Sequence, residues 1–267
     1  MRTHLTRNRL SIAALMYLFL CSVSAAEVET KGYDIAKRSD HSDQGFSDST
    51  ASITMVLRNA AGAESKRQLE IRTLEVMNED SGDKSLIIFS SPRDIKGTAL
   101  LSFAKILEAD DQWLYLPALK RVKRISSSNK SGPFVGSEFA FEDFTANELN
   151  KYTHKWLRTE PCAEFICDVI ERQPRYENSG YTRQIAWLDQ AVYQMRKLEF
   201  YDRKNTLLKT LKFEDYEKFN DGYWRAKRLL MHNHQTEKNT DLLYSNYEFK
   251  TGLTANDFVK GVLKRAR

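Results

Sequence analysis

The sequence lacks the short motifs that mark the common enzyme classes. It contains no Gly-x-Ser-x-Gly elbow, no phosphate-binding loop and no Cys-x-x-Cys pair. Of its histidines, only His232 and His234 are spaced to share one face of a strand. Because no further ligands follow at a recognisable spacing, two surface histidines are a better interpretation than a metal pair. We therefore predict a protein that is not an enzyme and that holds no cofactor and no metal.

Long apolar runs are also scarce, and the one present lies at the amino terminus. Arg2, Arg7 and Arg9 precede an apolar run at residues 10–23, and small residues follow at 24–26. This pattern predicts a signal peptide over 1–26, cleaved after Ala26, and therefore a periplasmic protein. The run is shorter than the roughly 18 residues of a spanning helix, so an uncleaved anchor is the weaker alternative.

The net charge is small once the segment 1–26 is removed. The chain has 41 basic and 36 acidic residues, a net charge of +5, and the segment 1–26 contributes three arginines and no acid. The remainder has 38 basic residues against 36 acidic ones, or +2. We therefore expect no nucleic-acid partner. The remaining residues, 27–267, are enough for one large β domain.

Cysteine is rare, and only Cys162 and Cys167 lie in the segment expected to remain. An exported location permits a disulfide between them. In a continuous strand, five residues would separate the two α-carbons beyond the roughly 7 Å that a disulfide spans. A bond therefore requires a turn near Ala163, and both a disulfide and two free thiols stay open.

Strand signals dominate the rest of the chain. The segments predicted as strands are 53–58, 67–77, 85–90, 98–107, 112–116, 121–125, 164–172, 182–188, 193–201, 207–216, 223–232 and 242–249. Their spacing is typical of consecutive antiparallel hairpins. Three segments are candidates for short covering helices: 27–37, 138–152 and 253–265.

Alternation within the strands predicts one apolar and one wet face. Leu69 and Ile71 share a face between charged neighbours, and the aromatic pair Trp113 and Tyr115 shares a face of another strand. A sheet of about a dozen strands must curl, and the few helices would cover its concave side only in part. A partly filled apolar concavity is a ligand site. The alternative is an ordinary filled barrel core.

The stretch 113–144 is the most informative part of the chain. A basic strand with Arg121 and Arg124 is followed by a Ser/Gly loop that ends at Gly136 and Ser137. Apolar surface and acidic groups then alternate, and this set comprises Phe134, Glu138, Phe139, Phe141, Glu142 and Asp143. We interpret the phenylalanines as wall or lid of the cavity and the loop as a mobile, charged gate. The two arginines either pair with Glu142 and Asp143, bind an anionic headgroup, or form a structural ion-pair cluster.

This stretch resembles the exported LolA-like family of outer-membrane lipoprotein-sorting proteins. The matching positions are Tyr115, Leu116, Pro117, Ala118, Arg121, Arg124, Gly136, Ser137, Glu138, Phe139, Glu142 and Asp143. Val135 departs from the family's usual methionine conservatively. The resemblance covers nearly the whole mature chain and implies an open half-barrel sheet with helices as a lid, which holds acyl chains on its concave side.

The resemblance also implies partners. It predicts a periplasmic carrier of lipid or lipoprotein cargo that acts with an inner-membrane exporter of the RND or MMPL type. We expect a monomer that contacts membranes transiently. The alternative is a non-carrier accessory subunit of such an exporter, and an unrecognised hydrolase is a distant third.

Overall fold

The computed structural model describes residues 24–78, 81–146, 148–220 and 222–265. Residues 1–23, most of the predicted signal peptide, lie outside this range. Helix α1 (Ala25–Ser42) begins after Ser24, whose hydroxyl accepts a hydrogen bond from the Glu27 backbone N–H. It is longer than the predicted helix 27–37 and spans the predicted cleavage point. No helix within the described ranges is long and apolar enough to cross a membrane.

Thirteen strands form one antiparallel sheet, and this confirms the prediction of a single large curved sheet with few helices. The strands are β1 (Asp48–Arg58), β2 (Glu64–Leu74), β3 (Ser81–Ser91), β4 (Ala99–Lys105), β5 (Asp111–Leu116), β6 (Arg121–Ile125), β7 (Tyr152–Cys162), β8 (Phe165–Pro174), β9 (Tyr181–Asp189), β10 (Met195–Asp202), β11 (Leu207–Phe219), β12 (Tyr223–Asn233) and β13 (Lys238–Phe249).

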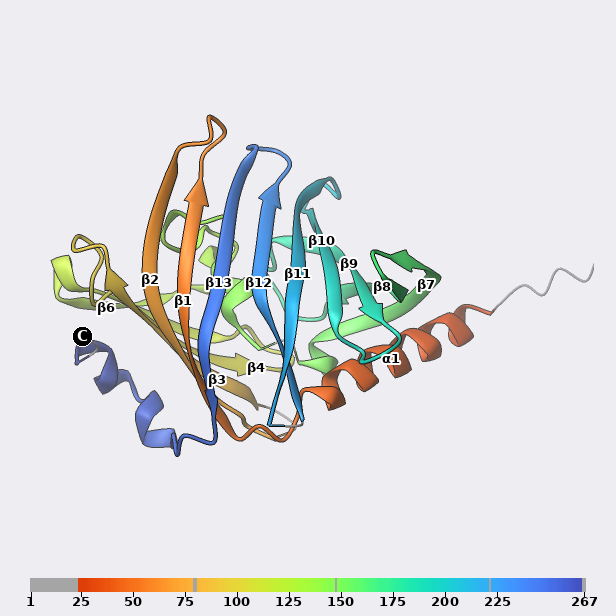
Figure 1. Ribbon diagram of the computed structural model, residues 1–267, viewed down its shortest axis with the longest axis horizontal. Helices are drawn as coiled ribbons and strands as arrows, with labels where there is room; N and C mark the ends of the chain where they lie inside the picture. Colours follow the sequence, from red (N-terminus) through yellow and green to blue (C-terminus); the bar gives the residue numbers. More distant parts are fainter. Residues whose placement is uncertain (1–23, 79–80, 147, 221, 266–267) are drawn as a thin grey trace, which may run out of the picture.

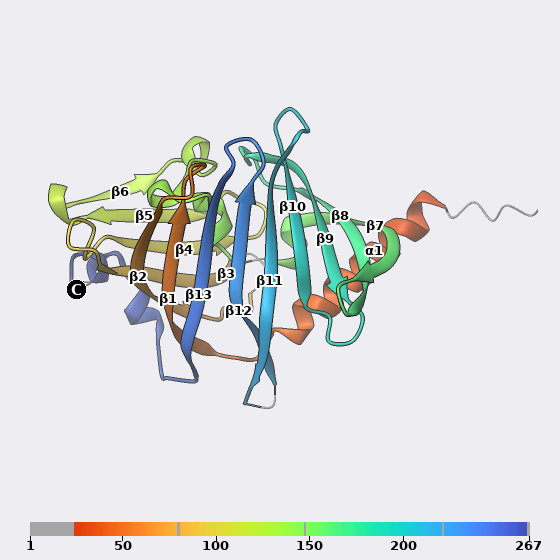
Figure 2. The same ribbon diagram turned by 45° about the horizontal axis from the view of Figure 1, so that its top comes forward.

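The order of strands explains how the chain is routed. The chain starts mid-sheet at β1, meanders to the edge strand β6, crosses to the other edge at β7, and meanders back until β13 pairs with β1 (Figures 1 and 2). Every neighbouring pair except β1–β13 is consecutive in sequence. Only the segment 126–151, here called the crossover segment, joins the two edges.

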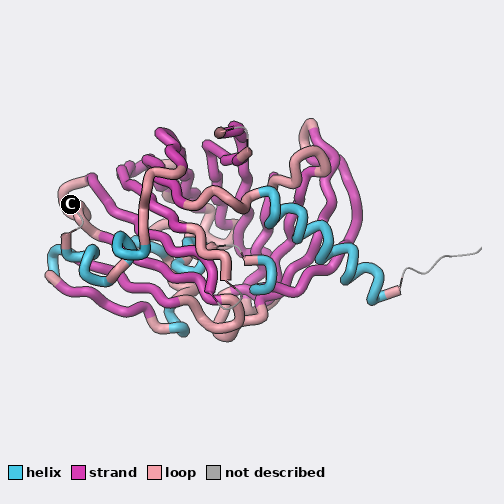
Figure 3. Tube along the Cα trace, turned by 90° about the horizontal axis from the view of Figure 1, so that it is seen from below, coloured by secondary structure: helices cyan, strands magenta, loops and turns pink. Residues whose placement is uncertain are grey.

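The two other candidate covering segments form short helices of the 3-10 type. Where helices were expected over 138–152 and 253–265, the chain forms short 3-10 turns: η4 (Phe141–Phe144) and η5 (Leu149–Lys151) in the crossover segment, and η6 (Ala255–Phe258) and η7 (Lys260–Lys264) near the C-terminus. Two further turns, η2 (Ser127–Asn129) and η3 (Phe134–Gly136), precede them, and η1 (Pro117–Leu119) joins β5 to β6. In Figure 3, seen from below, α1 runs along one side of the curved sheet.

Alternation along the strands separates the inner apolar cluster from the outer cluster at β3–β5 and from a smaller one at β8–β9. Leu100 of β4 pairs with Leu114 of β5 and belongs to the inner cluster, with the phenylalanines of the crossover segment. Leu101 pairs with Trp113 and belongs to the outer cluster, which Phe258 and Leu263 of the C-terminal turns complete. The C-terminal segment therefore seals the outer face of β3–β5 (Figure 1).

The hairpin between β7 and β8 contains the two cysteines. Cys162 and Cys167 form a disulfide, and their α-carbons lie 5.8 Å apart. Ala163 supplies the turn with a φ of 51°. The bond, which the sequence left open, thus occurs through a turn at the position where it is required.

The ring of Phe134 is fully buried, with centroid distances of 4.5 Å to Phe144 and 5.6 Å to Phe89. We expect Phe134→Ala to lower the free energy of unfolding by about 3–5 kcal/mol, since the lost contacts leave a cavity. Urea unfolding followed by tryptophan fluorescence measures this. Leu119→Ala is the matched control, because that side chain is 53% exposed and should change stability by less than about 0.5 kcal/mol. Equal effects of the two substitutions would contradict the packing described here.

Candidate functional site

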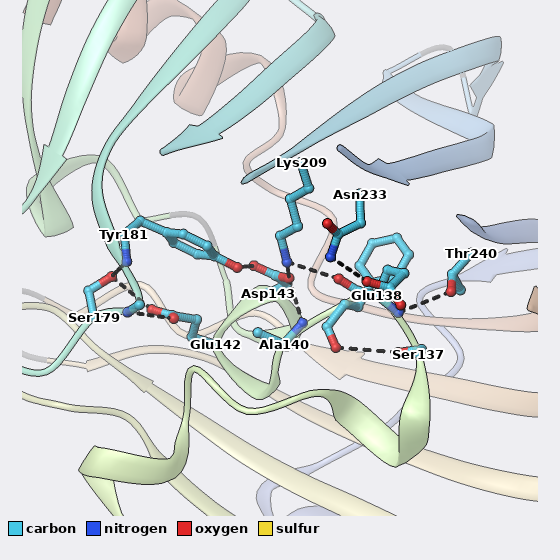
Figure 4. A network of polar contacts seen from close by, with 12 residues as sticks. Ser137, Glu138, Ala140, Glu142, Asp143, Ser179, Tyr181, Lys209, Asn233 and Thr240 are labelled. Carbon is cyan, nitrogen blue, oxygen red and sulfur yellow. Dashed lines mark hydrogen bonds and ion pairs between the residues drawn. The ribbon is translucent and has the colours of Figure 1, made fainter. Parts of the chain in front are cut away.

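The crossover segment lies against the inner face of the sheet and is held there by a buried ion pair. The Lys209 ammonium of β11 donates to the Asp143 carboxylate at 2.6 Å and to the Glu138 carbonyl at 3.0 Å (Figure 4). The Tyr181 hydroxyl donates to the other oxygen of Asp143 at 2.8 Å. The side chains of Lys209 and Asp143 are only 3% and 6% exposed. Such a pair offsets its desolvation cost only when further hydrogen bonds satisfy it, as they do here.

Glu142 provides a second anchor toward the β8–β9 turn. Its carboxylate accepts hydrogen bonds from the Gly180 backbone N–H at 2.8 Å, the Ser179 hydroxyl at 2.9 Å and the Tyr176 hydroxyl at 3.1 Å. Burial, together with the neighbouring charge of Asp143, raises the pKa of Glu142. The three donors oppose this shift, so the carboxylate is buried but well satisfied.

Glu138 provides a third anchor toward the middle of the sheet. Its carboxylate accepts from the Asn233 side chain at 2.6 Å, and its backbone N–H donates to the Thr240 hydroxyl at 3.0 Å. On the opposite half of the sheet, the Gln112 amide of β5 donates to the Phe141 carbonyl at 2.8 Å. The crossover segment is therefore tied to strands from both halves.

The segment fills the inner face only in part, and a cavity of about 550 Å³ remains beside it. The cavity floor consists of apolar side chains of β8–β13, namely Ile170, Ala186, Leu188, Met195, Leu198, Phe200, Leu211, Phe213, Leu229, Leu242 and Tyr244. Its cover consists of the C-terminal half of α1 and, from the crossover segment, Phe139, residues 142–146 and residues 148–150. The volume lies within the range of small-molecule sites.

A backbone irregularity in β13 brings Tyr247 against Tyr244, which lines the cavity. In β13, Asn246 adopts a φ of 53° and the pairing with β1 shifts register nearby. Tyr244 and Tyr247, three positions apart, consequently stack with nearly parallel rings 5.5 Å apart. A regular strand would place them on opposite faces.

The rim of the cavity carries carboxylates from three segments. Asp40 comes from α1, Asp83 from β3 and Glu148 from the crossover segment. Burial raises the pKa of all three, and it raises that of Asp83 to about 7 with smaller contributions from Glu148 and Glu75. The backbone N–H of Val76 donates to Asp83 and opposes the shift. The rim is thus an acidic border to an apolar space.

Two nitrogen-bearing side chains also line the cavity. Arg172 donates to the Gln184 amide oxygen at 2.6 Å and lies over the Tyr152 ring. The His154 ring nitrogen Nε2 lies 2.9 Å from the Leu149 carbonyl oxygen. Burial lowers the pKa of His154 to about 4, so the imidazole is neutral at pH 7.

The predicted site residues fall into separate places. Phe139, Glu142 and Asp143 line the cavity, while Gly136, Ser137 and Glu138 line a second hollow of about 600 Å³. Leu69, Ile71, Phe134 and Phe141 belong to the inner cluster but are not among the lining residues. Trp113 and Tyr115 lie in the outer cluster, on the opposite face of the sheet.

The arginines of the basic strand do not pair with Glu142 and Asp143. Arg124 forms its ion pair with Asp111 at 2.5 Å and is 69% exposed, and Arg121 is exposed. Asp143 instead contacts Lys209 and Tyr181, and Glu142 contacts the β8–β9 turn. The basic strand β6 is therefore a solvated edge, whose charges disfavour pairing with another chain.

Sequence reasoning missed Lys209, the partner of Asp143. One signal was available: Lys209, Leu211 and Phe213 alternate along β11, so the lysine occupies an inward position. An inward lysine must find a carboxylate or a ligand. Tyr181, Asn233 and Thr240 gave no comparable signal.

Comparisons with known proteins were consistent with this architecture. A family model described only as "-like: Uncharacterized protein" matches residues 81–265. A domain from Vibrio parahaemolyticus named for outer-membrane lipoprotein sorting is 52% identical, with a TM-score of 0.86 over 89% of this chain and 100% of that one. The fold is one open, curved antiparallel sheet with a single α-helix and short 3-10 helices. The chain belongs to the LolA-like family.

More distant structures share the fold. A DUF1329 family protein from Desulfovibrio piger is 28% identical, with a TM-score of 0.83 over 88% of this chain and 99% of that one. A LolA superfamily protein from Nitrosomonas europaea is 21% identical, with a TM-score of 0.69 over 86% and 98%. No curated protein matches the sequence.

Breaking the central ion pair should be costly. We expect Lys209→Met to lower the free energy of unfolding by about 3–5 kcal/mol, because the Asp143 carboxylate then stays buried without its cation. Adding Asp143→Asn should recover part of the loss. Urea unfolding at pH 7 measures both. Lys204→Met, at an exposed position on the β10–β11 turn, is the control, and a Lys209 variant as stable as this control would show that the pair does not hold the segment.

Asp83 should make stability fall with rising pH. Its folded pKa of about 7 lies above the ordinary 3.8, so the folded state holds this proton more tightly than the unfolded state. Stability is therefore lost between about pH 4 and pH 7 and is constant above. We expect Asp83→Asn to raise the melting temperature at pH 8 by several degrees, since about three pKa units correspond to at most about 4 kcal/mol and each kcal/mol shifts it by roughly 2–4 °C, and to change it little at pH 4. A variant with the same pH profile as the parent would rule out this assignment.

Proposed function

We propose that the protein is a periplasmic carrier that binds the acyl chains of a lipid or lipoprotein in its cavity and moves them toward the outer membrane. The observation that carries this proposal is the cavity of about 550 Å³ with an apolar floor. An apolar floor of this size favours binding of an acyl chain, because the chain removes apolar surface from water. The sorting role named for the Vibrio parahaemolyticus relative supports the same interpretation.

The composition of the cover supports reversible loading. It consists of one helix and a segment of short 3-10 turns, and these have far fewer backbone hydrogen bonds to their neighbours than the strands of the floor. Segments of this kind open locally at lower free energy than a sheet, which in the crossover segment applies beyond the anchors at 138–143. Chemistry is not required for such a role, so we propose a carrier and not an enzyme.

The proposal extends to location and partners. The basic, apolar and small-residue succession at 1–26 supports export and cleavage near Ala26, leaving 27–267 as the mature domain. We propose an inner-membrane exporter of the RND or MMPL type as partner, on the family resemblance alone, and a monomeric carrier that contacts membranes transiently. A non-carrier accessory subunit of the same exporter is the second candidate.

A charge on the cavity floor should abolish binding. Leu229 lines the cavity and is half-buried, so Leu229→Glu should remove lipid that co-purifies with the protein while unfolding it less than a charge in a filled core would. Mass spectrometry of extracted lipid, beside the melting temperature, measures both effects. Ile166→Glu, on an exposed strand position, is the control for the added charge.

Three outcomes separate the candidates. Bound acyl species in the parent and the Ile166 variant, but not in the Leu229 variant, support the carrier. A parent protein that is folded and empty after purification from its native periplasm favours the accessory subunit. Lipid retained by the folded Leu229 variant would mean that the chains bind elsewhere.

A further inference from the structure

The sheet is divided at one end between two of its middle strands. The backbone pairing of β12 with β13 ends at Arg228 and Leu243, and within the described part of the chain no backbone pair joins the two strands beyond it. β12 nevertheless stays paired with β11 as far as Tyr223, and β13 stays paired with β1 as far as Phe249. The two strands diverge toward these ends (Figures 1 and 2). We call this interruption the β12–β13 split.

Aromatic side chains close the split in place of backbone hydrogen bonds. The ring centroids of Tyr223 and Phe249 lie 5.2 Å apart across it. Phe219, which β11 supplies on the β12 side, lies 5.7 Å from Phe249 and 5.3 Å from Tyr247. These four half-buried residues are here called the aromatic plug. Rings can separate by rotation of their side chains, whereas two paired strands separate only when a ladder of backbone hydrogen bonds breaks.

The aromatic plug is continuous with the wall of the cavity. Tyr244 lines the cavity and stacks on Tyr247 of the plug, with the centroids 5.5 Å apart. The four plug residues themselves are not lining residues. A row of rings therefore leads from the cavity wall to the open end of the split, and displacing the outer rings leaves the wall itself unchanged.

The linker between α1 and β1, which belongs to the cover, is fastened beside the split. The Tyr223 hydroxyl donates to the Gly45 carbonyl oxygen at 2.6 Å, and Arg225 pairs with Asp43 and lies 5.2 Å from the Phe46 ring. Asp43 and Phe46 line the cavity. Because the Asp43 side chain is 53% exposed, solvent screens its ion pair and the pair holds the linker only weakly. Tyr223 thus belongs both to the plug and to the attachment of the cover.

We propose that a linear acyl chain enters and leaves the cavity through the β12–β13 split, with the aromatic plug as its gate. The inference rests on the proposed function, since it names the route into the same cavity. Only the plug and the adjoining linker need to move, so the anchors of the crossover segment at Glu138, Glu142 and Asp143 stay intact. The rings also offer apolar surface to the chain along its path, which lowers the cost of leaving a membrane or a micelle.

Rates of loading test this route, because a gate outside the cavity alters entry and release equally and leaves the affinity unchanged. The probe is N-phenyl-1-naphthylamine, followed by stopped-flow fluorescence, and its release is measured by displacement with excess dodecanol. We expect Phe219→Ala to raise both rate constants by about fivefold or more and to keep Kd within about twofold of the parent. Phe103→Ala is the matched control, because that half-buried ring contacts Trp113 on the outer face, and it should leave both rates unchanged.

A cross-link tests the same gate in the opposite direction. Tyr223→Cys combined with Phe249→Cys places two thiols across the split, where a short bis-maleimide can join them. Cys162 and Cys167 are already bonded to each other and do not react, and Cys21 lies in the predicted signal peptide. We expect the cross-linked protein to load about tenfold more slowly than the same variant blocked with N-ethylmaleimide. Mass spectrometry verifies that one reagent joins both cysteines.

The outcomes separate this inference from the proposed function. If the parent does not bind the probe, or dodecanol does not displace it, the carrier function itself fails. If the parent binds both but the cross-linked and blocked proteins load at the same rate, the split is not the route, and the chain enters between α1 and the crossover segment instead. A Phe219 variant whose Kd rises while its entry rate stays that of the parent would make the plug part of the binding wall and would also overturn the gate.

Discussion

The buried pair of Lys209 and Asp143 is the interaction on which the rest of the structure depends. An inward lysine in an apolar strand is unstable without a carboxylate, and the crossover segment supplies one from 66 residues away. The pair therefore fixes where the crossover segment lies across the sheet. Phe134, Phe139 and Phe144 follow from that placement, since they fill one end of the concave face and leave the other end open.

The cavity is the part of the concave face that the crossover segment leaves unfilled. Strands β8–β13 present more apolar surface than the crossover segment and α1 cover, and the C-terminal segment, a third possible cover, lies on the outer face instead. A bulge in β13 stacks Tyr247 on Tyr244 of the cavity wall, and carboxylates from α1, β3 and the crossover segment also line the cavity. Apolar depth and polar border thus come from different parts of the chain.

The sequence predicts the sheet well because its signal is local. Alternation such as that of Leu69 and Ile71, with turns between, is sufficient for an antiparallel meander. Strand β7 was not predicted from the sequence, because its apolar alternation is weak and Pro161 interrupts it. Within a sheet, proline is tolerated mainly in edge strands, and β7 is one.

The candidate site was less predictable, because it depends on contacts between distant segments. Trp113, Leu114, Tyr115 and Leu116 are apolar on both faces, so alternation does not tell which pair turns inward. The partners of Glu142 and Asp143 come from β9 and β11 and from a turn, and nothing in the neighbourhood of these acids indicates them.

The route of the chain has a mechanical consequence. The curved sheet has two free edges, and the crossover segment spans the distance between them. Flattening of the sheet would strain the hydrogen bonds of the crossover segment to Gln112 on one half and to Lys209 on the other. The length of the crossover segment between these contacts therefore limits how far the sheet can flatten. A cargo that widens the concave side must stretch this segment.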